Sequence, residues 1–318
     1  MLSDTKQKYL NFNEKEDLPI FLQPFWLDAT VGDAWDVALV EKGGQVVGAM
    51  PYTTTKRLNS LTYLGQPSLT QHLGPWIRPS TGKYAKQLAR EKDVMQSLIQ
   101  QLPAYDSFRQ NWSYTNQNWL PFYWKGFEQT TGYTYVLESL DDLNSVFDGF
   151  QENIRREIRK AQGRVKITVK SDVPLEEFLA LNQKTFARQD MQMANDRSFV
   201  NSLVEACMKK QGVKWFVAYD EQERPHAGVL IVWDKHSAYY LMGGGDPELR
   251  NSGATSLCMW EAIKFASTVT KRFDFEGSMI EPIERFFRGF GAMQKPYFQI
   301  SHTPNRWLRL AKALKAAR

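Results

Sequence analysis

The chain has 318 residues and a net charge of +5, and its 42% hydrophobic content suffices for one large or two ordinary domains with apolar cores. Because it contains two cysteines, four histidines and no CxxC spacing, we expect neither a disulfide framework nor a metal site. Segment 1–17 is polar and no run of roughly 18 apolar residues occurs, so we expect no signal peptide, no membrane span and a cytoplasmic protein.

Residues 1–138 are predicted to form an N-terminal domain built on a strand hairpin. Strands at 34–41 and 46–55 flank Lys42-Gly43-Gly44-Gln45, whose glycines suit a tight turn. The elements that follow are predicted as a strand at 61–65, a loop at 66–76, a helix at 84–102, a strand at 107–114, a short helix at 118–127 and a strand at 133–137.

Aromatic residues are concentrated between Trp112 and Phe127. Such a cluster is typical of a core, but with His72 and Trp76 it would alternatively line a substrate groove. The helix end at Arg188, Gln189 and Asp190 is a candidate edge of the same groove.

The pattern restarts after a polar stretch at 138–142, where we place the start of a C-terminal domain, 139–318, that ends in a basic helix. Gly243-Gly244-Gly245 are expected to end a strand at 237–242. The other elements predicted before it are helices at 141–150, 153–162, 174–187 and 198–210, and strands at 165–169, 213–219 and 227–233. Helices followed by an antiparallel meander and a crossover indicate a mixed α/β fold.

The stretch 237–301 carries the candidate site. Its first strand leads through the glycines into a helix at 257–266, for which Asn251 or Ser252 is a plausible N-cap. Backbone amides at 241–244 and the positive end of this helix would suit a phosphate or an oxyanion. A strand at 272–276, a helix at 282–288 and a strand at 295–301 complete the stretch.

This order of elements resembles the C-terminal half of a GNAT acyltransferase domain. More narrowly, FDFEGS at 273–278 and IERFFRGFG at 283–291 resemble the FemAB-like branch, whose chains carry two GNAT-like domains in tandem, and the basic segment 153–161 is similar to a helix of that branch. The resemblance implies two GNAT-like domains, each a mostly antiparallel mixed sheet flanked by helices. It also implies transfer of an acyl group from an acyl-CoA-like donor to a small-molecule or peptide amine.

Arg250-Asn251-Ser252-Gly253-Ala254-Thr255 approximates the pyrophosphate loop of GNAT enzymes, although Thr255 stands where glycine or alanine is usual. The resemblance therefore implies acyl-CoA as a co-substrate bound by these residues. A plain strand-to-helix turn is the alternative.

The strand at 272–276 offers two carboxylates. Asp274 and Glu276 share one face and Phe275 the other, so the acids should raise each other's pKa, and Glu276 would accept a proton from an attacking amine. Alternatively, these acids pair with Arg285 or Arg288. Tyr240 is the candidate proton donor, or else a core residue.

Arg285 and Arg288 lie on one side of their helix, where they would clamp a carboxylate or phosphate, and with Asp246 they form the predicted substrate-binding set. In the FemABX transferases a lysine follows the phenylalanine that corresponds to Phe286. Here Phe287 stands at that place and Arg288 is one step further on.

Two basic clusters favour an anionic partner, which would be a phosphorylated substrate, tRNA or an anionic membrane surface, whereas we expect no DNA partner. Seven Lys or Arg against one Glu occur in 153–170, and the last fourteen residues hold five basic and no acidic residues. Solvated helix faces are the plain alternative. Two other functions remain open: aminoacyl transfer from charged tRNA to a cell-wall precursor, and a non-catalytic binding protein on a GNAT frame.

Overall fold

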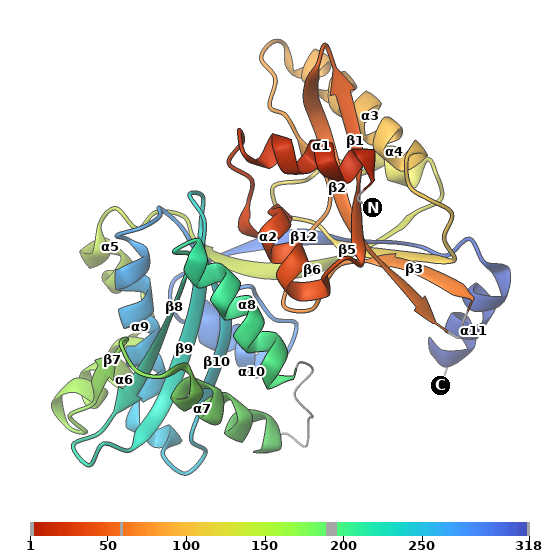
Figure 1. The fold of residues 1–318 in the computed structure, drawn as a ribbon. Helices are drawn as coiled ribbons and strands as arrows, with labels where there is room; N and C mark the ends of the chain where they lie inside the picture. The colour runs from red at the N-terminus through yellow and green to blue at the C-terminus, as the bar shows by residue number, and fades with distance from the viewer. Residues whose placement is uncertain (1–2, 58–59, 189–195, 317–318) are drawn as a thin grey trace. The chain divides into compact units, whose positions relative to one another are not determined.

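The computed structural model describes residues 3–57, 60–188 and 196–316, and the predicted groove residues Gln189 and Asp190 and the basic Arg318 lie outside these ranges (Figure 1). The chain forms two compact units. Unit 1 comprises Met1–Gly132 and Pro296–Arg318, and unit 2 comprises Tyr133–Lys295. Each unit has a mostly antiparallel mixed sheet flanked by helices, which confirms the predicted fold class.

The unit 1 sheet has the order β1 (Trp35–Lys42), β2 (Gln45–Arg57), β3 (Leu61–Gly65), β5 (Ser107–Asn111) and β12 (Met293–His302). The pair β3 and β5 is parallel and the other pairs are antiparallel, while β4 (Trp76–Ile77) pairs with β2. The hairpin between β1 and β2 turns at Gly43 and Gly44, whose φ angles of 60° and 75° require glycine.

Helices cover both faces of β1. Because side chains alternate along a strand, Ala38 and Val40 pack with α3 (Tyr84–Gln100), while Val37 and Leu39 pack with α1 (Asp4–Asn13) and α2 (Pro24–Val31). The short η1 (Ile20–Leu22) and α4 (Leu120–Tyr123) complete this part of the unit.

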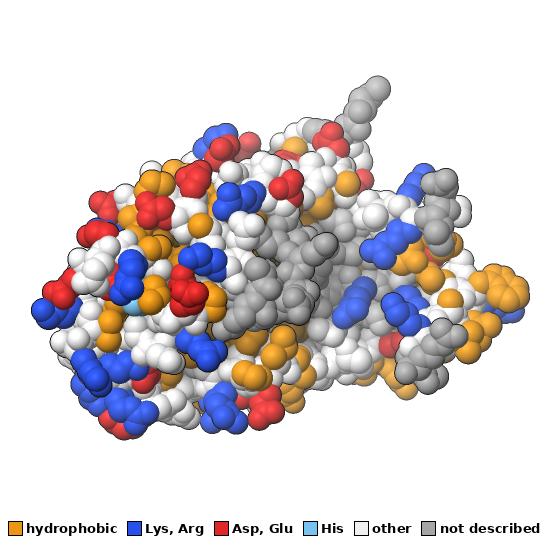
Figure 2. All heavy atoms as spheres, turned by 90° about the horizontal axis from the view of Figure 1, so that it is seen from below, with side chains coloured by type: hydrophobic (Ala, Val, Ile, Leu, Met, Phe, Trp, Pro, Cys, Tyr) orange, Lys and Arg blue, Asp and Glu red, His pale blue; other side chains and the backbone are white. Residues whose placement is uncertain are grey.

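The end of the chain returns to unit 1. We predicted that residues 296–318 would belong to a C-terminal domain starting at 139, but the structure places them in unit 1 and the crossing to unit 2 after Gly132. The cause is long-range pairing: Gln299–His302 of β12 pair antiparallel with Phe108–Asn111 of β5. The basic helix α11 (Arg306–Ala316) follows, and Figure 2 shows Lys and Arg side chains next to hydrophobic ones over this helix, at the right of the view.

The unit 2 sheet has the order β6 (Glu128–Leu137), β11 (Phe273–Asp274), β10 (Ala238–Gly245), β9 (Pro225–Trp233), β8 (Val213–Tyr219) and β7 (Thr168–Lys170). Among the described residues of these strands, β10 and β11 pair in parallel and the other neighbours pair antiparallel.

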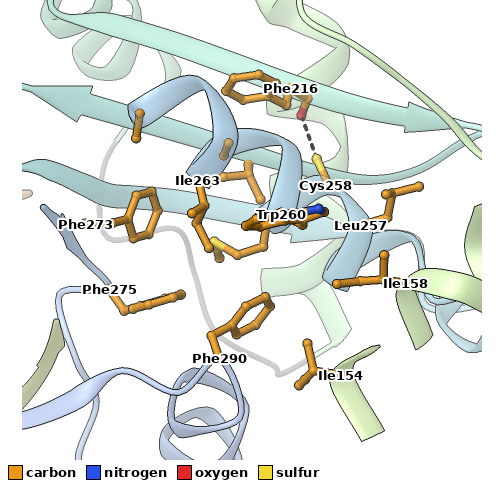
Figure 3. Close-up of a cluster of buried hydrophobic side chains, with 14 of the residues drawn as sticks. Ile154, Ile158, Phe216, Leu257, Cys258, Trp260, Ile263, Phe273, Phe275 and Phe290 are labelled. Atoms are coloured by element: carbon orange, nitrogen blue, oxygen red, sulfur yellow. Dashed lines mark hydrogen bonds between the residues drawn. The ribbon is translucent and has the colours of Figure 1, made fainter. Parts of the chain in front are cut away.

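Helices also cover both faces of this sheet. Val229 and Ile231 of β9 share a core with α6 (Glu152–Gly163) and α9 (Ala254–Ala266), while Gly228, which precedes Val229, lies against Phe178 of α7 (Leu175–Arg188). Figure 3 shows this core: Phe275, Phe290 and Ile154 gather with Trp260 and Ile263 of α9. The other helical elements of the unit are α5 (Leu143–Asp148), α8 (Arg197–Lys209), α10 (Glu281–Arg288) and η2 (Arg250–Ser252).

Our prediction that Gly243, Gly244 and Gly245 end a strand is wrong, because β10 runs through all three. A Cβ on Gly244 would lie 2.4 Å from the backbone nitrogen of Asn182 in α7, and one on Gly243 would lie 1.9 Å from the Tyr240 hydroxyl oxygen. The glycines therefore admit a helix backbone and a phenol close to the strand.

Candidate active site

The parallel pair β10 and β11 diverges after a very short contact. Only Ala238 with Phe273 and Tyr239 with Asp274 are paired. Beyond this point β10 has a register shift between Tyr240 and Met242 and continues along β9, whereas the Phe275 amide donates to the Tyr135 carbonyl of β6 at 2.9 Å. The strands thus separate where the sequence places Tyr240 on one and Glu276 after the other.

Asp274 and Glu276 form the predicted carboxyl pair. Asp274 is 1% exposed and accepts hydrogen bonds from the Thr134 hydroxyl and, at 2.8 Å, from the Glu276 amide. Burial raises the pKa of Asp274 to about 6, against the effect of these two hydrogen bonds. Burial and then the Asp274 charge raise the pKa of Glu276 well above its ordinary value. A carboxyl group of this kind suits proton exchange near neutral pH.

Backbone geometry turns Glu276 out of the strand. Its φ is +58°, and Gly277 follows at +59° with its α-carbon against β6, where a Cβ would lie 2.0 Å from the Tyr133 carbonyl oxygen. A left-handed conformation at a non-glycine residue costs of order 1 kcal/mol, and such residues occur often at functional sites.

Tyr240 lies beside this pair. Its ring packs edge-on against Phe287 at 5.7 Å between centroids, and its hydroxyl lies over Gly243. Burial, followed by the charges of Cys258 and Glu276, raises the pKa of the phenol, so Tyr240 keeps its proton at neutral pH. Of the predicted catalytic residues, the structure therefore brings Glu276 and Tyr240 together.

The segment 250–255 begins α9. Arg250, Asn251 and Thr255 are exposed, whereas Ser252, Gly253 and Ala254 are buried. Gly253 has φ +80°, and a Cβ there would lie 2.3 Å from the Glu157 carbonyl oxygen of α6. A bulky residue at this position would therefore disturb the packing of α6 as well as any ligand.

A buried series of hydrogen-bonded side chains, which we did not predict, holds segment 250–255. His226 Nε2 lies 3.1 Å from Asp220 Oδ2, and His226 Nδ1 lies 2.9 Å from Ser252 Oγ, which also accepts from the Ala254 amide at 3.3 Å. Burial would raise the pKa of Asp220, but hydrogen bonds from Arg224 and His226 hold it well below its usual range. These hydrogen bonds fix η2 to β9. The spacing of residues in the sequence does not reveal them, because Asp220, His226 and Ser252 lie in three separate segments.

The predicted substrate-binding residues are engaged in ion pairs. Arg285 pairs with Glu281 at 3.4 Å and Arg288 with Glu284 at 2.9 Å, both one turn apart on α10. Both arginines thus pair with acids of their own helix and not with Asp274 or Glu276. Glu284 also accepts from the Tyr135 hydroxyl at 2.7 Å.

Two further positions have structural partners. Asp246 pairs with Lys184 of α7 at 2.6 Å, which lowers its pKa. Phe287, at the place of the FemABX lysine, is 4% exposed and packs between Tyr240 and Phe275.

The basic helix α6 neutralises much of its own charge. Arg155 and Arg159 pair with Glu152, and Lys160 pairs with Glu157 at 2.5 Å. Part of the aromatic cluster of the first half is core, since Trp112, Phe122 and Phe127 are buried in unit 1, whereas Tyr123 and Trp124 are exposed. His72 is 6% exposed there, and burial lowers its pKa to about 4.

Within the described ranges, no three His, Cys, Asp or Glu side chains are grouped as a metal ion would need. In the same part of the chain, no helix combines the length and apolar character required to cross a membrane.

Comparison with known proteins agrees with this geometry. Residues 149–281 match the family model for an acetyltransferase (GNAT) domain. The chain is similar in fold to a crystal structure of FemX (14% identity, TM-score 0.69, 98% of each chain covered). It is also similar to L-PGS from Bacillus licheniformis (10%, 0.56, 99% of this chain and 97% of that one) and to a tandem GNAT protein from the clavulanic acid biosynthesis pathway (10%, 0.53, 94% of each). At these identities the similarities show the fold alone. No curated protein sequence matches the chain.

Proposed function

Because residues 149–281 form a GNAT acetyltransferase domain and the chain has the FemAB-like tandem form of this fold, we propose that the protein transfers an acyl group from an acyl-CoA thioester to an amine. The observation that carries the proposal is the divergence of β10 and β11, with Glu276 and Tyr240 at the point where they separate. A GNAT fold without ionisable groups at this point would offer no proton transfer.

In the proposed reaction, the amine nitrogen attacks the thioester carbonyl carbon directly. The C–N bond forms and the C–S bond breaks, while the Glu276 carboxylate accepts a proton from the amine and the Tyr240 phenol donates one to the leaving thiolate. The raised pKa values of both groups favour these roles, because a more basic carboxylate accepts a proton more readily and the phenol remains protonated. No covalent enzyme intermediate is required.

The donor would contact the start of α9. The first-turn amides of this 13-residue helix and the positive end of its dipole lie next to segment 250–255. The exposed Arg250 adds a full positive charge, which suits a pyrophosphate. Arg285 and Arg288 would contact the acceptor from α10, where half to two thirds of their side chains is exposed and their pairs with Glu281 and Glu284 can exchange for a ligand carboxylate.

Transfer from charged tRNA is the less favoured alternative. It would use α6 for RNA phosphates, yet three of the basic side chains of that helix are paired with its own glutamates. Phe287 in place of a lysine removes the group that the FemABX resemblance would require.

A peripheral contact with an anionic membrane is favoured by α11. Trp307, Leu310 and Leu314 are 82%, 53% and 63% exposed and recur at helical spacing. The same helix carries only basic charges: Arg306, Arg309, Lys312 and Lys315. An exposed apolar stripe beside basic residues suits the interface of an anionic bilayer, and we expect co-sedimentation with phosphatidylglycerol vesicles that Trp307→Ala reduces.

A thermal-shift experiment tests the donor. Acetyl-CoA, longer acyl-CoA esters, free CoA and tRNA are added in parallel, and saturating donor at about 100 times its Kd should stabilise the protein by about 3 kcal/mol. Arg250→Ala should weaken the shift, and Glu276→Gln should keep the shift but abolish amide formation. Stabilisation by tRNA and not by any CoA ester would contradict the proposal.

A further inference from the structure

Unit 1 contains a cavity of about 840 Å³ on one face of its sheet. The alternation along the strands separates the two faces: Phe108 and Ile300 point into the core with α3, whereas Arg109 and Ser301 line the cavity. The cavity therefore lies on the side of β3, β5 and β12 opposite the α3 core.

Three cations and no acids line this cavity. Arg57 comes from β2, Arg109 from β5 and Lys312 from α11. The polar groups beside them include hydroxyls and amides from β2, β5 and β12: Thr53, Thr55, Ser107, Asn111, Gln299 and Ser301. A merely solvated sheet face would mix both signs of charge.

The structure holds these cations in place. Lys312 Nζ donates to Ser107 Oγ at 2.8 Å and to Thr303 Oγ1 at 2.9 Å. The Arg57 guanidinium lies over the Tyr63 ring, 5.0 Å from its centroid.

Their charge is not compensated by direct ion pairs. Within the described part of the chain, none of Arg57, Arg109 and Lys312 has a carboxylate within ion-pair distance. Partial burial and then the Arg109 charge lower the pKa of Lys312, and the Glu128 charge opposes this effect. Arg109 and Lys312 are therefore close enough to repel each other, and an anion between them would relieve this repulsion.

We propose that this cavity binds a phosphate or diphosphate group. Two guanidinium groups and an ammonium suit the several oxygens of a phosphate better than the single charge of a carboxylate. The hydroxyls and amides around them suit the rest of a polar ligand, and the volume lies within the range of small-molecule sites. The site belongs to unit 1 and uses no residue of the proposed acyl-transfer site, so either proposal can fail alone.

Two sources would supply such a group: a soluble phosphate ester, or a lipid phosphate presented beside α11. Isothermal titration with pyrophosphate tests the first, and co-sedimentation with phosphatidic acid vesicles, compared with phosphatidylcholine vesicles, tests the second. Arg109→Gln and Arg57→Gln remove cavity cations that are not on α11. Lys56→Gln is the matched control, because this exposed residue is next to Arg57 on β2 but does not line the cavity.

The proposal is supported, and the source identified, if binding of either probe weakens about tenfold or more in Arg109→Gln and in Arg57→Gln and stays within about twofold in Lys56→Gln. Unchanged thermal unfolding of the variants confirms that they fold. Failure of both probes to bind the intact protein overturns the proposal, as does equal weakening by the cavity variants and Lys56→Gln, which would indicate general surface charge.

Discussion

The buried carboxyl of Asp274 should make the stability of unit 2 fall as the pH rises. Its ordinary pKa of 3.8 is raised to about 6 in the folded protein. Between these two values the folded state binds the proton and the unfolded state releases it, so ionisation favours unfolding. At about 1.4 kcal/mol per pH unit, the folded protein loses about 3 kcal/mol between acidic and neutral pH through this group.

Asp274→Asn should remove this loss. The asparagine keeps a carbonyl oxygen for the Thr134 hydroxyl and the Glu276 amide, and it cannot ionise. Any fixed cost of burying the new amide group shifts the stability equally at each pH. The expected result is therefore a difference between variant and wild type that moves by about 3 kcal/mol in favour of the variant as the pH rises from about 4 to neutral.

Urea denaturation followed by circular dichroism at a series of pH values measures this difference. The experiment is repeated in a Glu276→Gln background, because the Asp274 charge also raises the pKa of Glu276. Asp246→Asn is a control of opposite sign. Its carboxylate has a lowered pKa beside Lys184, so that variant should lose stability at neutral pH and recover it as the pH falls. A difference for Asp274→Asn that is flat across the series would refute the reasoning.

Three further predictions concern packing, the hydrogen bonds of the buried His226, and catalysis. Gly244→Ala places a methyl group 2.4 Å from the backbone of α7, which cannot move easily, so the free energy of unfolding should fall by about 1–3 kcal/mol. Gly245→Ala is the control and should cost less, because the nearest atom to its methyl group is 3.3 Å away. His226→Ala should cost about 1–3 kcal/mol, and a double-mutant cycle with Ser252→Ala should show coupling, whereas additive losses would argue against their direct interaction. The kcat/KM for amide formation should rise with pH through the raised pKa of Glu276, and a kcat/KM that does not change with pH would argue against Glu276 as the base.

Local spacing predicted what depends on neighbours in the chain. Asp274 and Glu276 lie close together as predicted, and the Asp274 charge helps to raise the pKa of Glu276. The pKa of Asp274, however, is raised by burial and not by Glu276, and the strand ends at Asp274 instead of continuing to Glu276. The Gly-Gly turn between β1 and β2 was predicted for the same reason, since its geometry is set by the turn residues themselves.

Partners distant in sequence decided the rest. The strand pattern near residue 300 was evident, but its place in unit 1 depends on pairing with β5, which lies far earlier in the chain. The contact of His226 with Ser252, and the cavity formed by β2, β3, β5, β12 and α11, likewise depend on how separate elements meet. A single sequence does not reveal these contacts.

The glycines of β10 show how such a distant contact changes the chemistry. We expected amides near 241–244 to receive an oxyanion. In the structure, Asn182 Nδ2 donates to the Gly243 carbonyl at 2.6 Å and the Gly245 amide donates to Thr185 Oγ1 at 2.9 Å, so α7 already occupies polar groups at this end of the strand. The Tyr240 hydroxyl lies over Gly243 at the side where β10 and β11 separate. In the proposed reaction, Tyr240 would stabilise the oxyanion before it protonates the leaving group, because a phenol with a raised pKa remains a hydrogen-bond donor. The three glycines matter chiefly because they let α7 and Tyr240 approach the strand.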